Sequence, residues 1–243
     1  MRILAFETTA KAASVALLED GILLAENYQN TGLTHSRTIL DMAEGMLRTC
    51  EMTVKEIDAV AVAKGPGSFT GVRIGVAAAK GLAWGAELPL YGVSTLESMA
   101  LNLGEFHGII CPAMDARRSQ VYNALFQAEN GTLTRLRPDR AISLQELEED
   151  LNHWDLPVIF VGDGAVLCYN TFGKKDARFH LAPEHRRHQR AAGVALAAME
   201  AIGRGESGDA AAMVPNYLRL SQAERERQER LQMEDRKETN RNG

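Results

Sequence analysis

Cysteine is scarce in this sequence, and its pattern excludes two classes of protein. Cys50, Cys111 and Cys168 are scattered along the chain and show no CxxC spacing. An odd number of isolated cysteines is typical of reduced thiols and argues against a disulfide framework or a structural zinc site. We therefore expect a protein of the cytoplasm.

Long hydrophobic runs and an excess of positive charge are also absent. Lys80 and Glu87 interrupt the longest apolar stretches, and the N-terminal segment is charged again within a few residues. We therefore expect neither a signal peptide nor a membrane span. The net charge of -5 and the pI near 5.7 give no field that would hold a polyanion, so nucleic acid should bind only through another protein.

The motifs of covalent and metal-dependent catalysis are missing as well. Ser68 directly follows Gly67, so there is no GxSxG elbow, and no cysteine has a histidine at motif spacing. His185 and His188 are three residues apart among arginines, which would repel a metal cation. His35 fits a helix start better than a general base. We expect no catalytic residue and no metal site.

The residues that are present predict an α/β protein of two related domains. With 45% hydrophobic and 24% charged residues, the chain can bury a core. Residues 1–104 begin with a strand and a hairpin at Asp20-Gly21, and continue as helix, strand, helix, strand, helix. Residues 105–220 start again with a strand and a hairpin, so each domain should contain a mixed sheet flanked by helices. Residues 221–243 carry 12 charges in 23 residues and are expected to be a charged tail.

A glycine-rich stretch, "KGPGSFTGVRIG", precedes the second of these helices and contains a stripe of small residues. Gly67, Gly71, Gly75, Ala79 and Ala83 are four apart, so another backbone could approach this side of the helix closely. The stripe either packs inside its own domain or meets a partner protein together with the helix over 34–50. The second interpretation gives these partner-binding candidates: Ile39, Met42, Met46, Gly71, Gly75, Ala79 and Ala83.

The same stretch is a poor phosphate loop. Its glycines fit neither GxxxxGK[ST] nor GxGxxG, and Val72 stands where a Walker lysine would follow Gly71. A nucleotide cradle between the domains would be formed by two strand-end acids and two glycine turns. These cofactor-binding candidates are Glu7, Gly65, Gly67, Asp115, Gly162 and Gly164.

Seven segments together resemble one bacterial family, the TsaB (YeaZ) family. The resemblance covers nearly the whole chain to about Glu224, and "GPGSFTGVRIG" followed by "DAR" and "VY" is its most specific part. The segments, in order, are "ILAFETTAKAASVAL", "THSRTILDMAEGML", "GPGSFTGVRIG", "GVSTLESMA", "MDARRSQVY", "VGDGA" and "NYLRLSQAE".

This resemblance implies the actin-like, Hsp70-like (ASKHA) fold and a part in making threonylcarbamoyladenosine at position 37 of tRNAs that read codons beginning with A. It implies a non-catalytic subunit that dimerises with the catalytic paralogue TsaD and activates it, with TsaE as a further partner and a homodimer when alone. The paralogue holds its metal with two histidines four apart, where this chain has Thr95 and Met99. No tightly bound cofactor is expected, although ATP or ADP could bind at the interface with the partner.

Two other classes of function remain as alternatives. The chain could be an independent ATPase or a metallopeptidase-like hydrolase of the same fold, but it lacks a metal pair, a Walker lysine and a nucleophile. It could also be a regulatory protein that binds a free nucleotide, if "GPGSFTG" and "VGDGA" still form a phosphate cradle. Against the latter, Glu7-Thr8-Thr9-Ala10 has no glycine for close approach to a phosphate, and the family commonly has Asp where this chain has Glu7.

Overall fold

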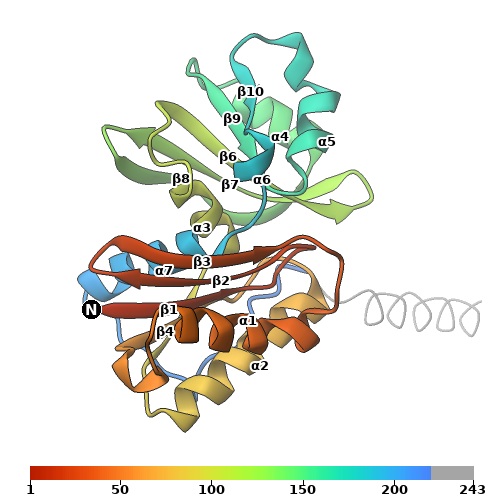
Figure 1. Cartoon of the computed structure of the whole chain (residues 1–243). Helices are drawn as coiled ribbons and strands as arrows, with labels where there is room; N and C mark the ends of the chain where they lie inside the picture. Colours follow the sequence, from red (N-terminus) through yellow and green to blue (C-terminus); the bar gives the residue numbers. More distant parts are fainter. Residues whose placement is uncertain (220–243) are drawn as a thin grey trace, which may run out of the picture.

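Two five-stranded sheets form the framework of the computed structural model, which describes residues 1–219. Their strand orders are β3-β2-β1-β4-β5 and β10-β9-β6-β7-β8. Counted within its own half, each sheet therefore has the order third, second, first, fourth, fifth. The first three strands of each sheet are antiparallel, and the last two join in parallel. This shared topology confirms the predicted fold of two related α/β domains, here called the first and second lobes (Figure 1).

The first lobe is a sheet with helices on both faces. Alternation along the strands sends Leu4 and Phe6 towards α1 and α2, and Ile3 and Ala5 towards α7. Both faces are buried, which explains why the strands β1 and β4 are almost entirely apolar. The elements are β1 (Arg2–Glu7), β2 (Ala13–Glu19), β3 (Ile22–Gln29), α1 (His35–Thr49), η1 (Val54–Glu56), β4 (Ala59–Ala63), α2 (Phe69–Gly85), β5 (Leu90–Val93) and α3 (Thr95–Leu101).

The predicted hairpin between β2 and β3 is confirmed at Asp20-Gly21. Both residues have positive φ, +50° for Asp20 and +83° for Gly21, as a two-residue type I′ turn requires. The equivalent turn of the second lobe, at Asn130-Gly131, has φ of +50° and +76°. The same type of turn therefore joins the second and third strands of each lobe.

The second lobe packs α4 and α5 on one face of its sheet and α3 on the other. The sequence patterns did not predict β10, η2 and α6, which have three or four residues each and are too short to show a period. Its elements are β6 (Gly108–Arg117), β7 (Gln120–Glu129), β8 (Thr132–Ser143), α4 (Leu144–Leu151), β9 (Val158–Val161), α5 (Ala165–Thr171), η2 (Gly173–Lys175), β10 (Phe179–Leu181) and α6 (Glu184–Arg187).

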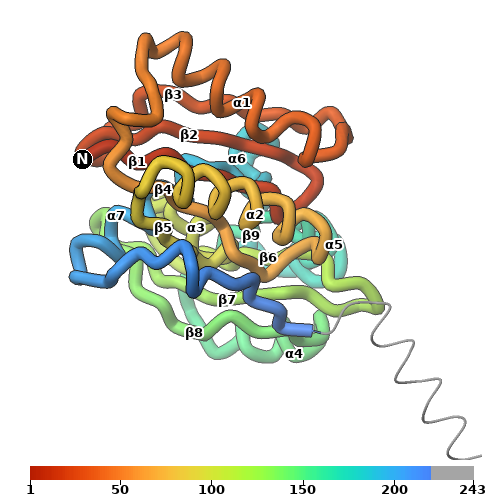
Figure 2. The backbone as a smooth tube through the Cα atoms, turned by 90° about the horizontal axis from the view of Figure 1, so that it is seen from below, coloured from red at the N-terminus to blue at the C-terminus, as the bar shows by residue number. Residues whose placement is uncertain are grey.

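The chain then returns to the first lobe. Helix α7 (Ala191–Gly203) lies on the first sheet, where Ala191, Val194 and Ala198 pack against the apolar strands. Residues 205–219, here called the strap, continue beside α2 (Figure 2). The expected second domain, residues 105–220, therefore includes two segments that pack on the first lobe, α7 and the strap. Helix α7 packs there because it covers the apolar face of the first sheet that α1 and α2 leave open. The expected tail, 221–243, lies outside the described residues.

Within residues 1–219, the structure contains no helix long and apolar enough to cross a membrane.

Candidate functional site

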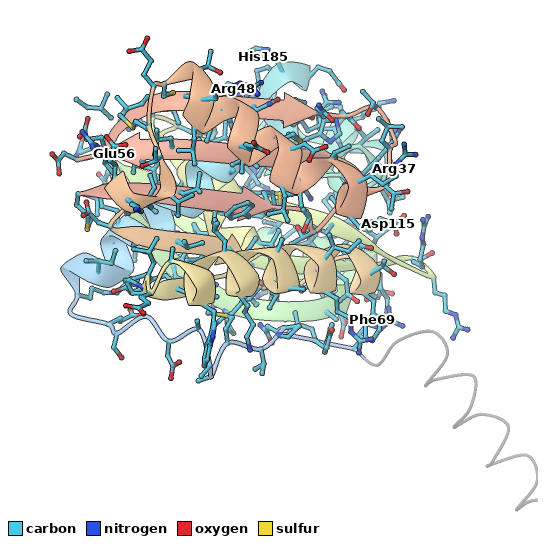
Figure 3. The ribbon with its side chains drawn as sticks, turned by 60° about the horizontal axis from the view of Figure 1, so that its bottom comes forward. Arg37, Arg48, Glu56, Phe69, Asp115 and His185 are labelled. Carbon is cyan, nitrogen blue, oxygen red and sulfur yellow. The ribbon has the colours of Figure 1, made fainter. Side chains whose placement is uncertain are left out.

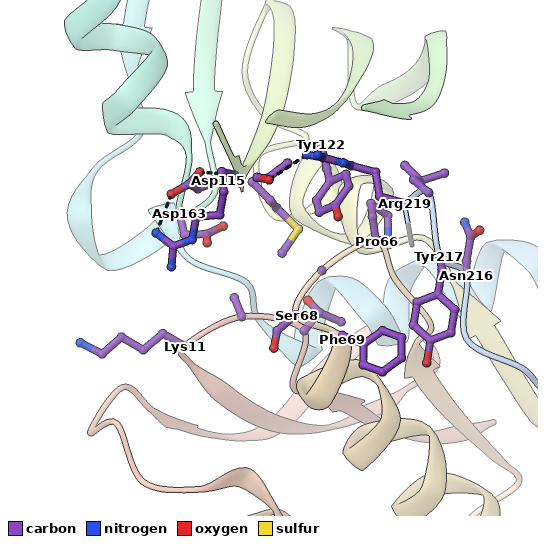
Figure 4. Close-up of a pocket in the computed structure, with 17 residues that line it drawn as sticks. Lys11, Pro66, Ser68, Phe69, Asp115, Tyr122, Asp163, Asn216, Tyr217 and Arg219 are labelled. Carbon is purple, nitrogen blue, oxygen red and sulfur yellow. Dashed lines mark hydrogen bonds and ion pairs between the residues drawn. The ribbon is translucent and has the colours of Figure 1, made fainter. Parts of the chain in front are cut away.

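A cleft of about 490 Å³ lies where the two lobes meet, at the carboxyl ends of β1, β4, β6 and β9. Residues of both lobes and of the strap form its walls (Figure 4). The first lobe provides Thr9, Lys11 and Gly67 to Phe69, the second lobe provides Asp115, Tyr122 and Asp163, and the strap provides Asn216 to Arg219.

The two lobes bring equivalent residues to this cleft. Glu7 ends β1 and Asp115 lies near the end of β6, the corresponding strand of the second lobe. Gly65 and Gly162 follow the parallel neighbours of these strands, with φ of +112° and +105°. A side chain would be strained at both positions. The structure therefore gathers the predicted acids and glycine turns at one place.

The two further glycines allow close packing of the backbone. A Cβ atom at Gly67 would lie 2.5 Å from the carbonyl oxygen of Thr9, and one at Gly164 would lie 3.0 Å from that of Ala113. Of the six cofactor-binding candidates, only Gly67 and Asp115 line the cleft. The other four build its floor.

Two N–H groups of the glycine-rich stretch are bonded within the protein. The N–H of Ser68 donates to the carbonyl oxygen of Thr9 at 2.7 Å, and the N–H of Gly71 donates to Ser68 Oγ at 3.3 Å. Asp115 Oδ1 accepts from the N–H of Arg117 at 2.7 Å, which is a turn contact. The cleft lining carries two carboxyls, Asp115 and Asp163, together with three cations, Lys11, Arg117 and Arg219.

Glu7 is a fully buried carboxyl at the floor of the cleft. Burial raises its pKa to about 7, hydrogen bonds from Thr9 oppose this, and the charge of Asp163 adds to it. Its Oε1 accepts from the N–H of Thr9 at 2.6 Å, while its Oε2 has no hydrogen-bond partner among the described residues. A proton on this carboxyl would remove the cost of a buried charge.

Asp163 faces Glu7 from the second lobe. Its side chain is accessible from the cleft, but desolvation by the surrounding protein raises its pKa, and a hydrogen bond from Gln189 opposes the rise. Gln189 Nε2 donates to Asp163 Oδ1 at 3.0 Å. Because Gln189 lies two residues before the start of α7, this bond links the second lobe to the segment that returns to the first.

Thr95 and Met99 are buried in α3 between the lobes. Met99 belongs to the apolar cluster against the second sheet, and Thr95 Oγ1 has no hydrogen-bond partner among the described residues. Within residues 1–219, no group of three or more His, Cys, Asp and Glu side chains is arranged to hold a metal ion. Neither side chain is suited to bind a metal in place of imidazole.

The stripe of small residues on α2 packs inside the first lobe, which corrects the expectation that it meets a partner. A Cβ atom at Gly71 would overlap the carbonyl oxygen of Thr8, and one at Gly75 would overlap Thr8 Oγ1. Thr8 Oγ1 also donates to the carbonyl oxygen of Gly71 at 2.7 Å. Ala79 and Ala83 are 0% and 1% exposed. The stripe exists because the end of β1 crosses α2 at backbone distance.

The expected partner-binding residues of α1 are internal for a similar reason. Ile39, Met42 and Met46 pack on the first sheet in the same core cluster. Helix α1 is amphipathic, and these residues form its apolar face. All seven named residues are therefore buried within the folded chain.

The opposite face of α2 is exposed, and sequence reasoning did not identify it. Ala77, Gly81 and Trp84 are exposed there, and Trp84 has 72% of its surface open to solvent. A groove of about 610 Å³ between α1 and α2 adjoins this face, lined by apolar side chains including Leu40, which is 51% exposed. Figure 3 shows the two helices side by side over the sheet, with Phe69 at the end nearest Asp115. The signal in the sequence was a helix that has apolar residues on nearly all sides.

The histidines and arginines near the lobe junction have structural partners. His35 Nε2 lies 2.7 Å from the carbonyl oxygen of Ala10, and Thr34 precedes the helix without capping it through its side chain. Arg186 pairs with Glu105, and Arg190 pairs with Glu26. The segment around His185 therefore joins the lobes.

Comparison with known proteins identifies similar chains. A family model described as "TsaD: tRNA N6-adenosine threonylcarbamoyltransferase" matches residues 29–227. The tRNA threonylcarbamoyladenosine biosynthesis protein TsaB of Bacillus subtilis is 37% identical over 228 residues, which are 92% of this chain and 96% of that protein. TsaB of Escherichia coli is 46% identical over 134 residues, 54% of this chain and 58% of that protein.

Solved structures agree with these sequences. YeaZ from Pseudomonas aeruginosa superposes with a TM-score of 0.75 at 26% identity, over 89% of this chain and 99% of that one. A protein of the same organism, described as uncharacterized with similarity to peptidase YEAZ, gives a TM-score of 0.78 at 27% identity, over 90% of this chain and 99% of that one.

Proposed function

This chain belongs to the TsaB (YeaZ) family, and from that premise we propose that it takes part in threonylcarbamoyladenosine formation in tRNA as a non-catalytic subunit. Its role is to bind and activate the catalytic paralogue TsaD, whose family model matches residues 29–227. The chain itself brings no nucleophile at motif spacing.

The observation that carries this proposal is the exposed side chain of Leu40 on α1 together with the exposed face of α2. Docking would remove the apolar surface of Leu40 on α1 and of Trp84 on α2 from water, and the small Ala77 and Gly81 are exposed on α2 as well. Between Phe69 and Gly85, only Arg73 and Lys80 are charged. A large exposed aromatic on a nearly uncharged helix is typical of a protein interface. We call Leu40, Ala77, Gly81 and Trp84 the partner face.

Charge introduction tests this face. We expect Trp84→Glu to abolish coelution with purified TsaD and to abolish tRNA modification in a reaction with TsaD, TsaE, tRNA, ATP and threonylcarbamoyl-adenylate. The folded chain should keep its melting temperature, because Trp84 is 72% exposed. Leu40→Glu, on the neighbouring helix, should have the same effect.

Ile22 provides a matched control. It is an apolar side chain, 67% exposed, on the edge strand β3 and outside the partner face. Ile22→Glu should leave coelution and modification unchanged. If Trp84→Glu and Leu40→Glu both bind TsaD as the unchanged chain does, the partner face is assigned incorrectly.

The same proposal includes TsaE as a further partner, ATP or ADP at the interface with TsaD, and tRNA bound only through the complex in the cytoplasm. A homodimer through the same face is the form expected when TsaD is absent. The competing proposal of an independent ATPase or hydrolase requires turnover by the chain alone. ATP turnover above about 1 per second that is lost in Asp115→Asn would favour it.

A further inference from the structure

The strap, residues 205–219, connects the partner face to the cleft. It begins after α7, passes beside α2 (Figure 2), and ends among the residues that line the cleft. It has no regular secondary structure of its own, so side-chain and backbone contacts from other elements must fix its position. Those contacts are specific.

The two charged residues of α2 both hold the strap. Lys80 Nζ donates to the carbonyl oxygens of Ala211 and Met213, at 3.3 and 3.0 Å. Arg73 Nε donates to the hydroxyl of Tyr217 at 2.8 Å. Arg73 and Lys80 therefore both have hydrogen-bond partners on the strap.

Aromatic and backbone contacts complete the attachment. The ring of Tyr217 stacks on that of Phe69, with centroids 4.7 Å apart, and the guanidinium of Arg73 lies 3.8 Å from the centroid of Phe69. The N–H of Asn216 donates to the carbonyl oxygen of Lys64 at 2.6 Å. Helix α2, the glycine-rich loop and the strap therefore form one unit.

Two glycines of the first lobe make room for the strap. A Cβ atom at Gly65 would lie 2.5 Å from the carbonyl oxygen of Asn216, and one at Gly92 would lie 2.5 Å from Met213 Sδ. Such distances are shorter than side chains tolerate. The absence of side chains at Gly65 and Gly92 therefore leaves the space that the strap occupies.

The end of the strap reaches the second lobe. Arg219 Nη1 donates to the carbonyl oxygen of Ala116 at 2.9 Å, beside Asp115. Along α2, residues 73 and 80 border the exposed face, because turns of about 100° per residue place them next to Ala77 and Trp84. On the strap itself, Val214 and Tyr217 are 66% and 39% exposed. A partner docked on α2 would thus meet the strap at its edge.

We propose that the strap is a latch that couples the partner face to the width of the cleft between the lobes. A partner bound to α2 holds the strap against Arg73 and Lys80. Arg219 then holds the second lobe at a fixed distance from the first. This coupling rests on the proposed function for the identity of the partner, but the attachment of the strap does not.

Spin-label distances between the lobes test the coupling in the full chain. Labels would be placed at Asp20→Cys in the first lobe and Lys174→Cys in the second, in a Cys50→Ser background. Adding TsaD should narrow the distance distribution and slow hydrogen exchange of the Asn216 amide at least about tenfold. In Arg219→Ala, TsaD should bind with affinity unchanged within about twofold, but the distribution should stay broad. Lys175→Ala is the control and should behave as the unchanged chain.

Two results would overturn the latch. One is a distance distribution between the lobes that does not change when TsaD binds, and the other is a distribution that narrows in Arg219→Ala as it does in the unchanged chain. If TsaD does not bind at all, the proposed function fails, and the latch is judged on the chain alone. In the isolated chain, Tyr217→Ala should speed hydrogen exchange of the Asn216 amide at least about tenfold and broaden the distribution of spin-label distances between the lobes. Unchanged exchange in Tyr217→Ala would reject the latch independently of any partner.

Discussion

Replacing Glu7 by glutamine tests whether the buried carboxyl at the floor of the cleft is neutral in the folded chain. The unfolded chain loses this proton above pH 4.5, whereas the folded chain keeps it until about pH 7. The folded state therefore binds more protons between these values, so its stability falls as the pH rises through this range. The full contribution of the neutral carboxyl is present only below pH 4.5.

The magnitude follows from the two pKa values. Each pH unit between 4.5 and about 7 corresponds to about 1.4 kcal/mol, so ionisation of Glu7 lowers the free energy of unfolding by about 3 kcal/mol at pH 8. Glutamine has nearly the same shape and can still accept from the N–H of Thr9, but it cannot ionise. The free energy of unfolding of Glu7→Gln, measured relative to the unchanged chain, should therefore be higher at pH 8 than at pH 4.5.

Urea denaturation at several pH values between 4.5 and 8 measures this difference. Groups that titrate in both chains cancel, so the difference between them isolates Glu7. Glu129→Gln, at an exposed hairpin position, is the control and should show no such trend. A difference between Glu7→Gln and the unchanged chain that stays constant with pH would refute the assignment of a neutral Glu7.

Three further predictions concern packing and charge. Ala79→Trp should cost about 1–3 kcal/mol and lower the melting temperature by several degrees, because Ala79 is 0% exposed; an unchanged melting curve would contradict its internal position. Gly71→Ala should be destabilising through overlap with Thr8, whereas Gly81→Ala, with open space around it, should stabilise α2 by about 0.5–1 kcal/mol. Gel-shift titration of the isolated chain at physiological salt should show weak tRNA binding, and submicromolar affinity without TsaD would refute this.

Local patterns in the sequence were enough to predict most of the fold. Hairpin turns depend on two adjacent residues, and Asp20-Gly21 and Asn130-Gly131 both adopt the positive φ that such pairs favour. Helices α1 and α2 follow from the spacing of apolar residues, and the repeated order of elements predicted two related lobes. The motifs predicted the family, because they combine residues of several elements in a fixed order.

The candidate site was only partly predictable. Sequence position indicated that Asp115 ends a strand, since acids at strand ends meet at one edge of a sheet. The interaction of Glu7 with Asp163, and the bond from Gln189 to Asp163, join both lobes and the return to α7. Such contacts have no local signature, because the residues are neighbours only after the lobes have packed.

The direction of each face of α2 was decided by the tertiary structure alone. A stripe of small residues permits any backbone to approach, and only the folded chain shows that Thr8 occupies that side. Arg73 is 144 residues from Tyr217, and Lys80 is 133 residues from Met213. The sequence by itself determined which residues form α2 and that the helix is apolar on nearly all sides. The sheet and the strap decided which of those sides remains exposed, because burial depends on what packs against a helix and not on the helix itself.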